Sequence, residues 1–134
     1  MKRILTAILV LAIGCGQGQV NWQQASNWRL YRITGNAIFS ISVDSLRGMK
    51  SYPLRTDSMA GLLDSVHQLA ADVKPAWMGG TVATCTCDGK TRKIIISDYA
   101  GFFYDQSSGT YFQLSLQKKD DWMDYINSCV LKLL

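Results

Sequence analysis

The chain has 134 residues and a formal net charge of +4, and 48% of its residues are hydrophobic. This length suits one domain with a single hydrophobic core. The basic residues are scattered, and the densest group, Lys90, Arg92 and Lys93, lies in a predicted strand, so the composition argues against nucleic-acid binding.

The N-terminal segment has the pattern of a bacterial-type signal peptide. Lys2 and Arg3 precede an apolar run from Ile4 to Ile13 that only Thr6 interrupts, and small residues follow it. A run of this length is too short for a permanent membrane-spanning helix. We therefore expect residues 1–18 to be removed on export to the periplasm or to the outside of the cell, which lowers the net charge from +4 to about +2.

Two processing routes remain open. Small residues before Gln17 and Gln19 fit an ordinary signal peptidase, which would release a soluble protein that begins at one of these two positions. The stretch Leu11-Ala-Ile-Gly-Cys15 instead resembles a lipobox, although alanine stands three places before the cysteine, where leucine is usual. Cleavage there removes residues 1–14 and leaves an envelope lipoprotein with a structural role, anchored to the membrane through acylated Cys15 alone.

The first predicted part of the fold is a hairpin that follows a polar linker. Residues 19–27 are polar and lack a period, so we expect a linker or frayed terminus before a single domain over residues 28–134. Residues 28–34 and 37–43 are rich in β-formers, and Gly35-Asn36 separates them. Two such runs with a two-residue Gly-Asn link predict a β-hairpin with one buried face.

An edge strand and a helix are predicted next. Residues 49–54 are extended, and Pro53 restricts them to the edge of a sheet or to a connection. From Asp57 to Val73 the apolar residues recur with the period of an α-helix, with Thr56 or the first residue of this range as N-cap and Pro75 as the stop. We expect one amphipathic helix over this range.

The stretch from Thr81 to Leu116 predicts a meander of four antiparallel strands. The four runs, which share β-branched and aromatic residues, are 81–87, 90–97, 102–106 and 110–116. Asp88-Gly89 joins the first two as a strong hairpin signal, and Ser107-Ser-Gly109 joins the last two, with a glycine that can adopt positive φ. We expect the rest of the chain to cover this sheet.

The last predicted element is an amphipathic helix that begins near Lys119, with Asp120 and Asp121 in its first turn. Its apolar stripe consists of Trp122, Ile126, Cys129, Val130 and Leu133. The fold class that follows is α+β: an antiparallel sheet, made of the N-terminal hairpin and the four-stranded meander, with two amphipathic helices packed on one face.

Three cysteines are the most informative chemical groups of the mature chain. Cys85 and Cys87 point to the same side of one strand, and Cys129 lies on the stripe of the last helix. In an oxidising compartment we expect a disulfide from Cys129 to one of the other two, which closes a loop of about 45 residues and contributes on the order of 4 kcal/mol. The remaining thiol is interpreted as an inert buried group, with a labile, redox-active disulfide or a metal site that includes His67 as alternatives.

The sequence carries no catalytic motif. It lacks a glycine-rich phosphate loop, a serine elbow and a paired-histidine metal motif, and His67 is its only histidine. The acids Asp88, Asp98 and Asp105 lie in turns or a strand, where aspartate commonly bonds to the backbone. A thiol-dependent redox or hydrolytic enzyme therefore remains an alternative to a binding function, and we expect neither a cofactor nor a bound metal.

Aromatic residues crowd the last hairpin and favour binding. The candidates for a binding face are Phe102, Phe103, Tyr104, Tyr111 and Phe112. Neighbouring residues of a strand point to opposite faces, so some of these rings look outward if the helices cover only one face. Such a face could bind a peptide, a glycan or a partner protein, unless a second layer covers it. We therefore predict a small exported binding or interaction domain.

Overall fold

The computed structural model describes residues 20–33, 35–73, 75, 81–97 and 101–134. The predicted signal peptide, with Cys15, lies outside them. The described elements in chain order are the 3-10 helix η1 (Trp22–Gln24), β1 (Ser26–Tyr31), α2 (Ala37–Ser40), α3 (Val43–Arg47), β2 (Ser51–Pro53), α4 (Thr56–Leu62), β3 (His67–Gln68), β4 (Thr81–Cys87), β5 (Lys90–Ile96), β6 (Phe102–Asp105), β7 (Thr110–Gln113) and α5 (Leu116–Leu131). The mixed α+β class is confirmed.

The described strands form one open antiparallel sheet of seven strands, in the order β2-β1-β4-β5-β6-β7-β3. In its centre, β4 and β5 pair residue for residue along their whole length. Asp88 and Gly89 between them have φ values of +54° and +75°. Positive φ at both central residues matches the turn that follows the twist of paired strands, which is why this dipeptide predicts the hairpin correctly.

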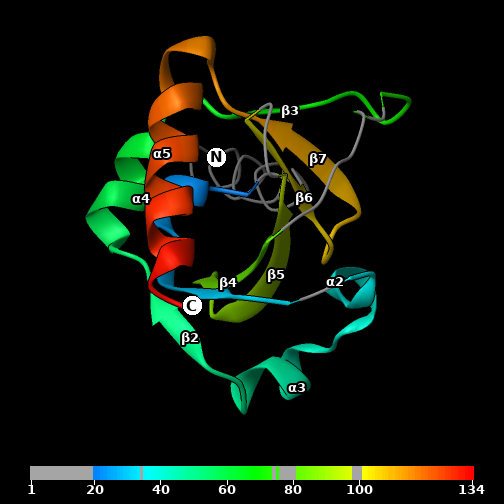
Figure 1. Ribbon diagram of the computed structural model, residues 1–134. Coiled ribbons are helices and arrows are strands. Elements are labelled where there is room, and N and C mark those ends of the chain that lie inside the picture. The colour runs from blue at the N-terminus through cyan, green and yellow to red at the C-terminus, as the bar shows by residue number, and fades with distance from the viewer. Residues whose placement is uncertain (1–19, 34, 74, 76–80, 98–100) are drawn as a thin grey trace, which may run out of the picture.

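The two faces of the sheet carry different layers. Helices α4 and α5 lie side by side over one face, while α2 and α3 lie on the opposite side of the molecule (Figure 1). The main core, between the sheet and α4 and α5, includes Trp28, Leu30, Ile94, Ile96, Phe103, Met59, Trp122 and Ile126. A smaller outer core consists of Tyr31, Ile38, Leu46, Val82 and Ile95.

The prediction of a strand at residues 37–43, the second strand of the N-terminal hairpin, is wrong. Residues 37–40 form α2 and residues 43–47 form α3, and β1 pairs with β2 and β4 instead. Ser42 caps α3, because its Oγ accepts a hydrogen bond from the backbone N–H of Ser45 at 3.1 Å. The two short helices also bury Ile38 and Leu46 on the sheet. Capping and burial together favour the helices more than the β propensity of the segment favours a strand.

The predicted helix from Asp57 to Val73 is wrong in its second half. Helix α4 ends at Leu62, Ser65 has a φ of +66°, and the chain then forms β3 against β7. Beyond β3 the backbone N–H of Leu69 donates to the carbonyl oxygen of Tyr111 at 2.9 Å. If the helix continued to Val73, the backbone groups at the edge of β7 would have no strand to bond with. The hydrogen bonds between β3 and β7 therefore outweigh the helical pattern of apolar residues in this segment.

The packed fold includes residues that were predicted as a polar linker. Trp22 in η1 is 2% exposed, and its ring centroid lies 5.1 Å from that of Phe103 and 5.3 Å from that of Phe112. Ala25 is also buried. Trp22 and Ala25 therefore belong to the main core, although the residues around them are exposed.

The remaining elements lie close to where the sequence places them. Strand β2, which contains Pro53, forms one edge of the sheet, as predicted. Helix α5 begins at Leu116 and buries Trp122, Ile126 and Cys129 against the sheet. The hydroxyl of Tyr125 accepts a hydrogen bond from the backbone N–H of Arg55 at 2.9 Å, which connects α5 to the start of α4.

Candidate functional site

The aromatic residues predicted for a binding face divide between the two faces of the sheet. Phe103 and Phe112 lie in the main core with stacked rings, their centroids 5.5 Å apart. Phe102 is buried as well. Tyr104 and Tyr111 are half-buried and belong to the face opposite α5. Of the five candidates, these two line an open surface.

Tyr104 and Tyr111 form the floor of a pocket. They are cross-strand partners in β6 and β7, and their ring centroids are 4.7 Å apart with 40° between the ring planes. The pocket has a volume of about 330 Å³. Its other described lining residues are Gln68, Leu69, Ala70, Ala71, Gly109 and Thr110. We call this site the tyrosine pocket, and its volume lies at the small end of the range of roughly 300 to 1,000 Å³ typical of ligand sites.

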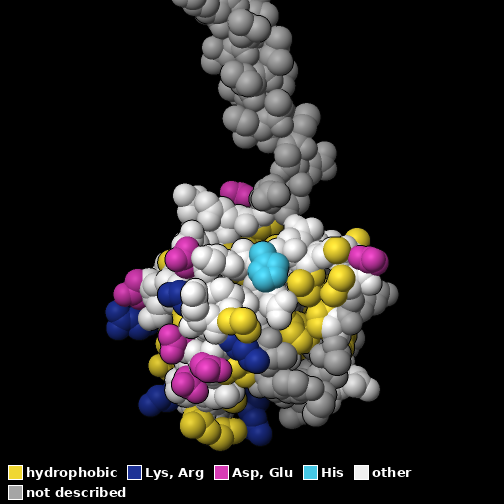
Figure 2. Space-filling view, turned by 90° about the horizontal axis from the view of Figure 1, so that it is seen from above, with side chains coloured by type: hydrophobic (Ala, Val, Ile, Leu, Met, Phe, Trp, Pro, Cys, Tyr) yellow, Lys and Arg dark blue, Asp and Glu magenta, His cyan; other side chains and the backbone are white. Residues whose placement is uncertain are grey.

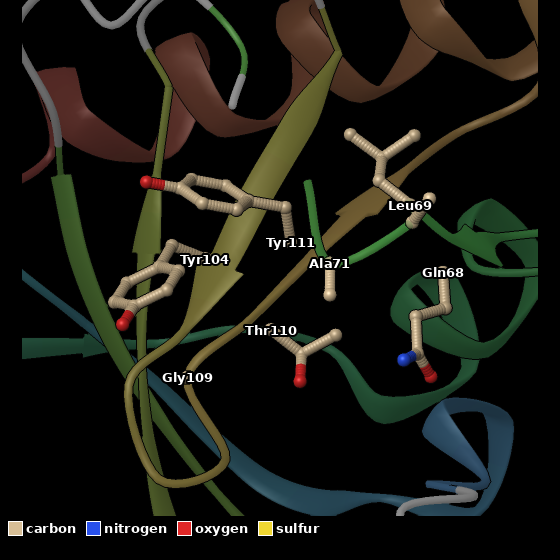
Figure 3. Close-up of a pocket in the computed structure, with 8 residues that line it drawn as sticks. Gln68, Leu69, Ala71, Tyr104, Gly109, Thr110 and Tyr111 are labelled. Atoms are coloured by element: carbon tan, nitrogen blue, oxygen red, sulfur yellow. The ribbon is translucent and has the colours of Figure 1, made fainter. Parts of the chain in front are cut away.

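The second wall of the tyrosine pocket is the segment that follows β3. The hydrogen bond from Leu69 to Tyr111 holds this segment beside β7, and a turn bond from the N–H of Val73 to the carbonyl oxygen of Ala70, 2.9 Å long, closes its far end. Figure 3 shows the two tyrosines on one side of the pocket and Gln68 and Leu69 on the other. Backbone pairing therefore sets the width of the pocket.

The β6–β7 loop is held by a buried carboxylate. Asp105 has no exposed surface, and its oxygens accept hydrogen bonds from Ser107 N–H at 3.2 Å and from Ser108 Oγ at 2.6 Å. The same carboxylate pairs with Arg92 Nη1 at 2.6 Å. A charge-assisted network of this kind fixes the loop that closes one end of the pocket.

Gly109 completes that loop beside Tyr104. Its φ is +71°, a conformation that favours glycine, and a Cβ added there would stand 3.7 Å from the hydroxyl oxygen of Tyr104. The glycine thus supplies the turn geometry and leaves room next to the phenol.

The three cysteines of the described chain are buried thiols, and no disulfide joins them. Burial, together with the charges of Cys87 and Asp105, raises the pKa of Cys85 to about 12. Burial also raises the pKa of Cys87 and that of Cys129. A nucleophilic cysteine needs a thiolate near neutral pH, which these surroundings disfavour. The disulfide from Cys129 to Cys85 or Cys87 stays a prediction.

His67 lies apart from the cysteines of β4. It is exposed on β3, and β5, β6 and β7 separate β3 from β4 in the sheet. Neighbouring strands lie about 4.8 Å apart, so four such steps place β3 about 19 Å from β4. Figure 2 shows the histidine on the surface, with hydrophobic side chains on one side of it and most of the visible acidic ones on the other. Within the ranges given above, no group of three or more His, Cys, Asp or Glu side chains is placed to hold a metal ion.

The predicted acids also have structural surroundings. Asp88 lies in the β4–β5 turn, Asp105 holds its loop, and Asp98 lies outside the described residues. The sequence interpretation missed the wall at residues 68–71, because a helix was predicted there. It also missed the ion pair of Arg92 with Asp105, which the alternation of side chains along two adjacent strands could have indicated.

Comparisons of the chain with protein-family models, with curated proteins and with solved structures gave no match. Among the helices of the described segments, none has the length and apolar character needed to cross a lipid bilayer.

Proposed function

We propose that this chain is a small exported binding domain and that the tyrosine pocket is its ligand site. The observation that carries this proposal is that the paired rings of Tyr104 and Tyr111 form the floor of a pocket of about 330 Å³. Tyrosine offers a large, rigid contact area at a small cost in side-chain entropy, which makes it common in binding sites. No described group around the pocket has the acid, base or nucleophile arrangement that catalysis needs.

The layer arrangement supports the same proposal. Two amphipathic helices, α4 and α5, fill one face of the antiparallel sheet, and the meander β4 to β7 carries the pocket on its other face. On that face α2 and α3 pack against Val82 and Ile95 of β4 and β5. Among the residues that the structure describes, those of α2 and α3 are absent from the lining of the tyrosine pocket on β6 and β7, which supports a ligand site there.

Export to the periplasm or the medium is part of the proposal, and the apolar run after Lys2 and Arg3 supports it. The alternative is an envelope lipoprotein held by Cys15, which the lipobox-like stretch before that residue favours. Mass spectrometry of the mature N-terminus separates the two, because an acylated Cys15 supports the anchor and a free Gln17 or Gln19 supports release.

A thiol-dependent enzyme is the alternative that the site supports least, since burial raises the pKa of all three described thiols. Thiol titration of the exported protein, with and without reductant, tests the sulfur chemistry. We expect one disulfide that includes Cys129 and one remaining thiol. Three reactive thiols in the unreduced protein would contradict the predicted disulfide.

The binding proposal is tested by a thermal-shift screen with small molecules, peptides and oligosaccharides. A ligand that binds only the folded state raises the melting temperature. We expect ligands that stabilise the unchanged chain to lose their effect on the variants Tyr104→Ala, Tyr111→Ala and Gln68→Ala. Tyr52→Ala is the matched control, because it removes a half-buried tyrosine from β2 at the opposite end of the strand order. Ligands that act equally on all variants would contradict the proposal.

A further inference from the structure

We propose that the tyrosine pocket binds a neutral saccharide. This inference rests on the proposed function and names the ligand class of the same site. Three features carry it: the uncharged lining, the combination of aromatic faces with neutral polar groups, and the compact shape of the pocket.

The lining selects against charged ligands. The described residues around the pocket are tyrosine, glutamine, threonine, leucine, alanine and glycine, and none carries a formal charge. A basic group does belong to this face of the sheet, on Lys93, but its ammonium group donates to the carbonyl oxygen of Ile41 at 2.8 Å. Lys93 is only 5% exposed, so it is committed to holding the α2–α3 segment. An anionic ligand would therefore lack a counter-charge among the described residues that line the site.

The lining matches the two chemical sides of a sugar ring. A pyranose has C–H groups on its faces, which pack against aromatic rings, and hydroxyl groups around its edge, which need neutral donors and acceptors. The rings of Tyr104 and Tyr111 present the aromatic surface, with 40° between their planes. The exposed amide of Gln68 stands at the same pocket and can donate and accept hydrogen bonds. The hydroxyl of Thr110 donates to the carbonyl oxygen of Ser108 at 3.4 Å and can accept a hydrogen bond from a ligand.

The shape of the pocket favours a compact ring over an extended chain. A proline-rich peptide docks along an open, aromatic-lined groove through several successive residues. Here the segment 68–71, held by the hydrogen bond from Leu69 to Tyr111, closes one side, and the loop at Gly109 closes another. One or a few sugar units fit such a site better than an extended strand does.

The test is calorimetric titration of the full chain, expressed with its own N-terminal segment, against three sets of probes. These are neutral oligosaccharides of glucose, galactose, mannose and N-acetylglucosamine, the sulfated and uronic-acid counterparts, and proline-rich peptides. We expect a neutral oligosaccharide to bind, with affinity about tenfold or more weaker for Tyr111→Ala and about threefold or more weaker for Gln68→Ala. Tyr111→Phe keeps the ring and should stay within about threefold of the unchanged chain, and Tyr52→Ala should have no effect.

The outcomes separate the ligand class from the function. Binding of peptides or charged saccharides alone, lost in the Tyr111 and Gln68 variants, would overturn the saccharide inference and leave the proposed function standing. Neutral saccharides that bind equally to every pocket variant would overturn both. An absence of binding by all three probe sets at millimolar concentration would overturn the saccharide inference and leave the proposed function to the thermal-shift screen. Gln68 is exposed, so Gln68→Ala gives a reading even where a tyrosine variant fails to fold.

Discussion

Asp105 shows at the scale of one residue how the fold supports its candidate site. A carboxylate without exposed surface is tolerated only when it is paired and hydrogen-bonded, because removing its charge from water is costly. Arg92, Ser107 and Ser108 provide the donors, at distances from 2.6 to 3.2 Å. The same bonds fix the loop that places Gly109 beside Tyr104.

The substitution Asp105→Asn should lower the free energy of unfolding by about 3 kcal/mol, because it leaves the partly buried Arg92 without its counter-charge. Urea denaturation followed by circular dichroism measures this loss. Asp44→Asn is the matched control, since Asp44 pairs with Arg47 on the exposed surface. The urea concentration at the midpoint of unfolding should be the same for this variant as for the unchanged chain. An equally unchanged midpoint for Asp105→Asn would show that the buried pair contributes nothing.

The buried thiol of Cys85 should make the reduced protein less stable at alkaline pH. Its thiol has a pKa of about 12 in the folded chain and an ordinary value of 9.0. Below pH 9 both states keep the proton, and stability is unaffected. Above it the unfolded chain releases the proton first, so the free energy of unfolding falls as pH rises towards 12, by up to about 1.4 kcal/mol per pH unit for this thiol.

Urea titrations of the reduced protein between about pH 8 and about pH 10.5 measure this slope. Cys87 and Cys129, whose pKa values burial also raises, add to the fall in the same direction. Cys85→Ala removes one contributor and should flatten the decline. A decline of the same steepness in Cys85→Ala would contradict the assignment to this thiol.

At the scale of elements, local signals account for what the sequence could predict. The β4–β5 hairpin follows from two β-branched runs and from Asp88-Gly89, all of which act within the segment itself. The segments 37–47 and 63–73 depend on distant partners, namely the outer face of the sheet and the free edge of β7. The candidate site divides in the same way: its aromatic pair was predictable, and its wall at residues 68–71 was not.

Helix α3 gives a testable case of such dependence on distant partners. Its five residues are too few for a stable isolated helix, so packing must hold it. Leu46 is fully buried in the outer core with Tyr31, Val82 and Ile95. We expect Leu46→Ala to lower the free energy of unfolding by about 3 kcal/mol, as for other large-to-small changes in a core.

Chemical denaturation measures the Leu46→Ala effect, with Val43→Ala as the control. Val43 lies in the same helix but is only half-buried, so its loss should be clearly smaller. Equal losses for the two variants would show that Leu46 does not anchor α3.

At the scale of the whole molecule, the two faces of one sheet carry cores of different size. The main core on one face contains Trp22, Trp28 and Trp122, each at most 2% exposed, and supplies most of the buried apolar surface. The other face carries the smaller outer core and the tyrosine pocket. The variant Gln68→Ala, which changes an exposed side chain of the pocket, should therefore alter binding without unfolding the chain.

Trp22 holds the N-terminal part of the described chain in the main core. Its ring contacts Trp28, Phe103 and Phe112, with centroid distances from 5.1 to 6.3 Å, although its neighbours in the sequence are polar. We expect Trp22→Ala, or removal of residues 20–24 from a chain that starts at Gln19, to lower the free energy of unfolding by about 3 to 5 kcal/mol. The exposed Gln24 provides the control, and Gln24→Ala should leave stability unchanged. Urea denaturation followed by tryptophan fluorescence measures the stability of each variant. If the Trp22→Ala protein is as stable as the unchanged chain, residues 21–27 are a linker, as the sequence predicts.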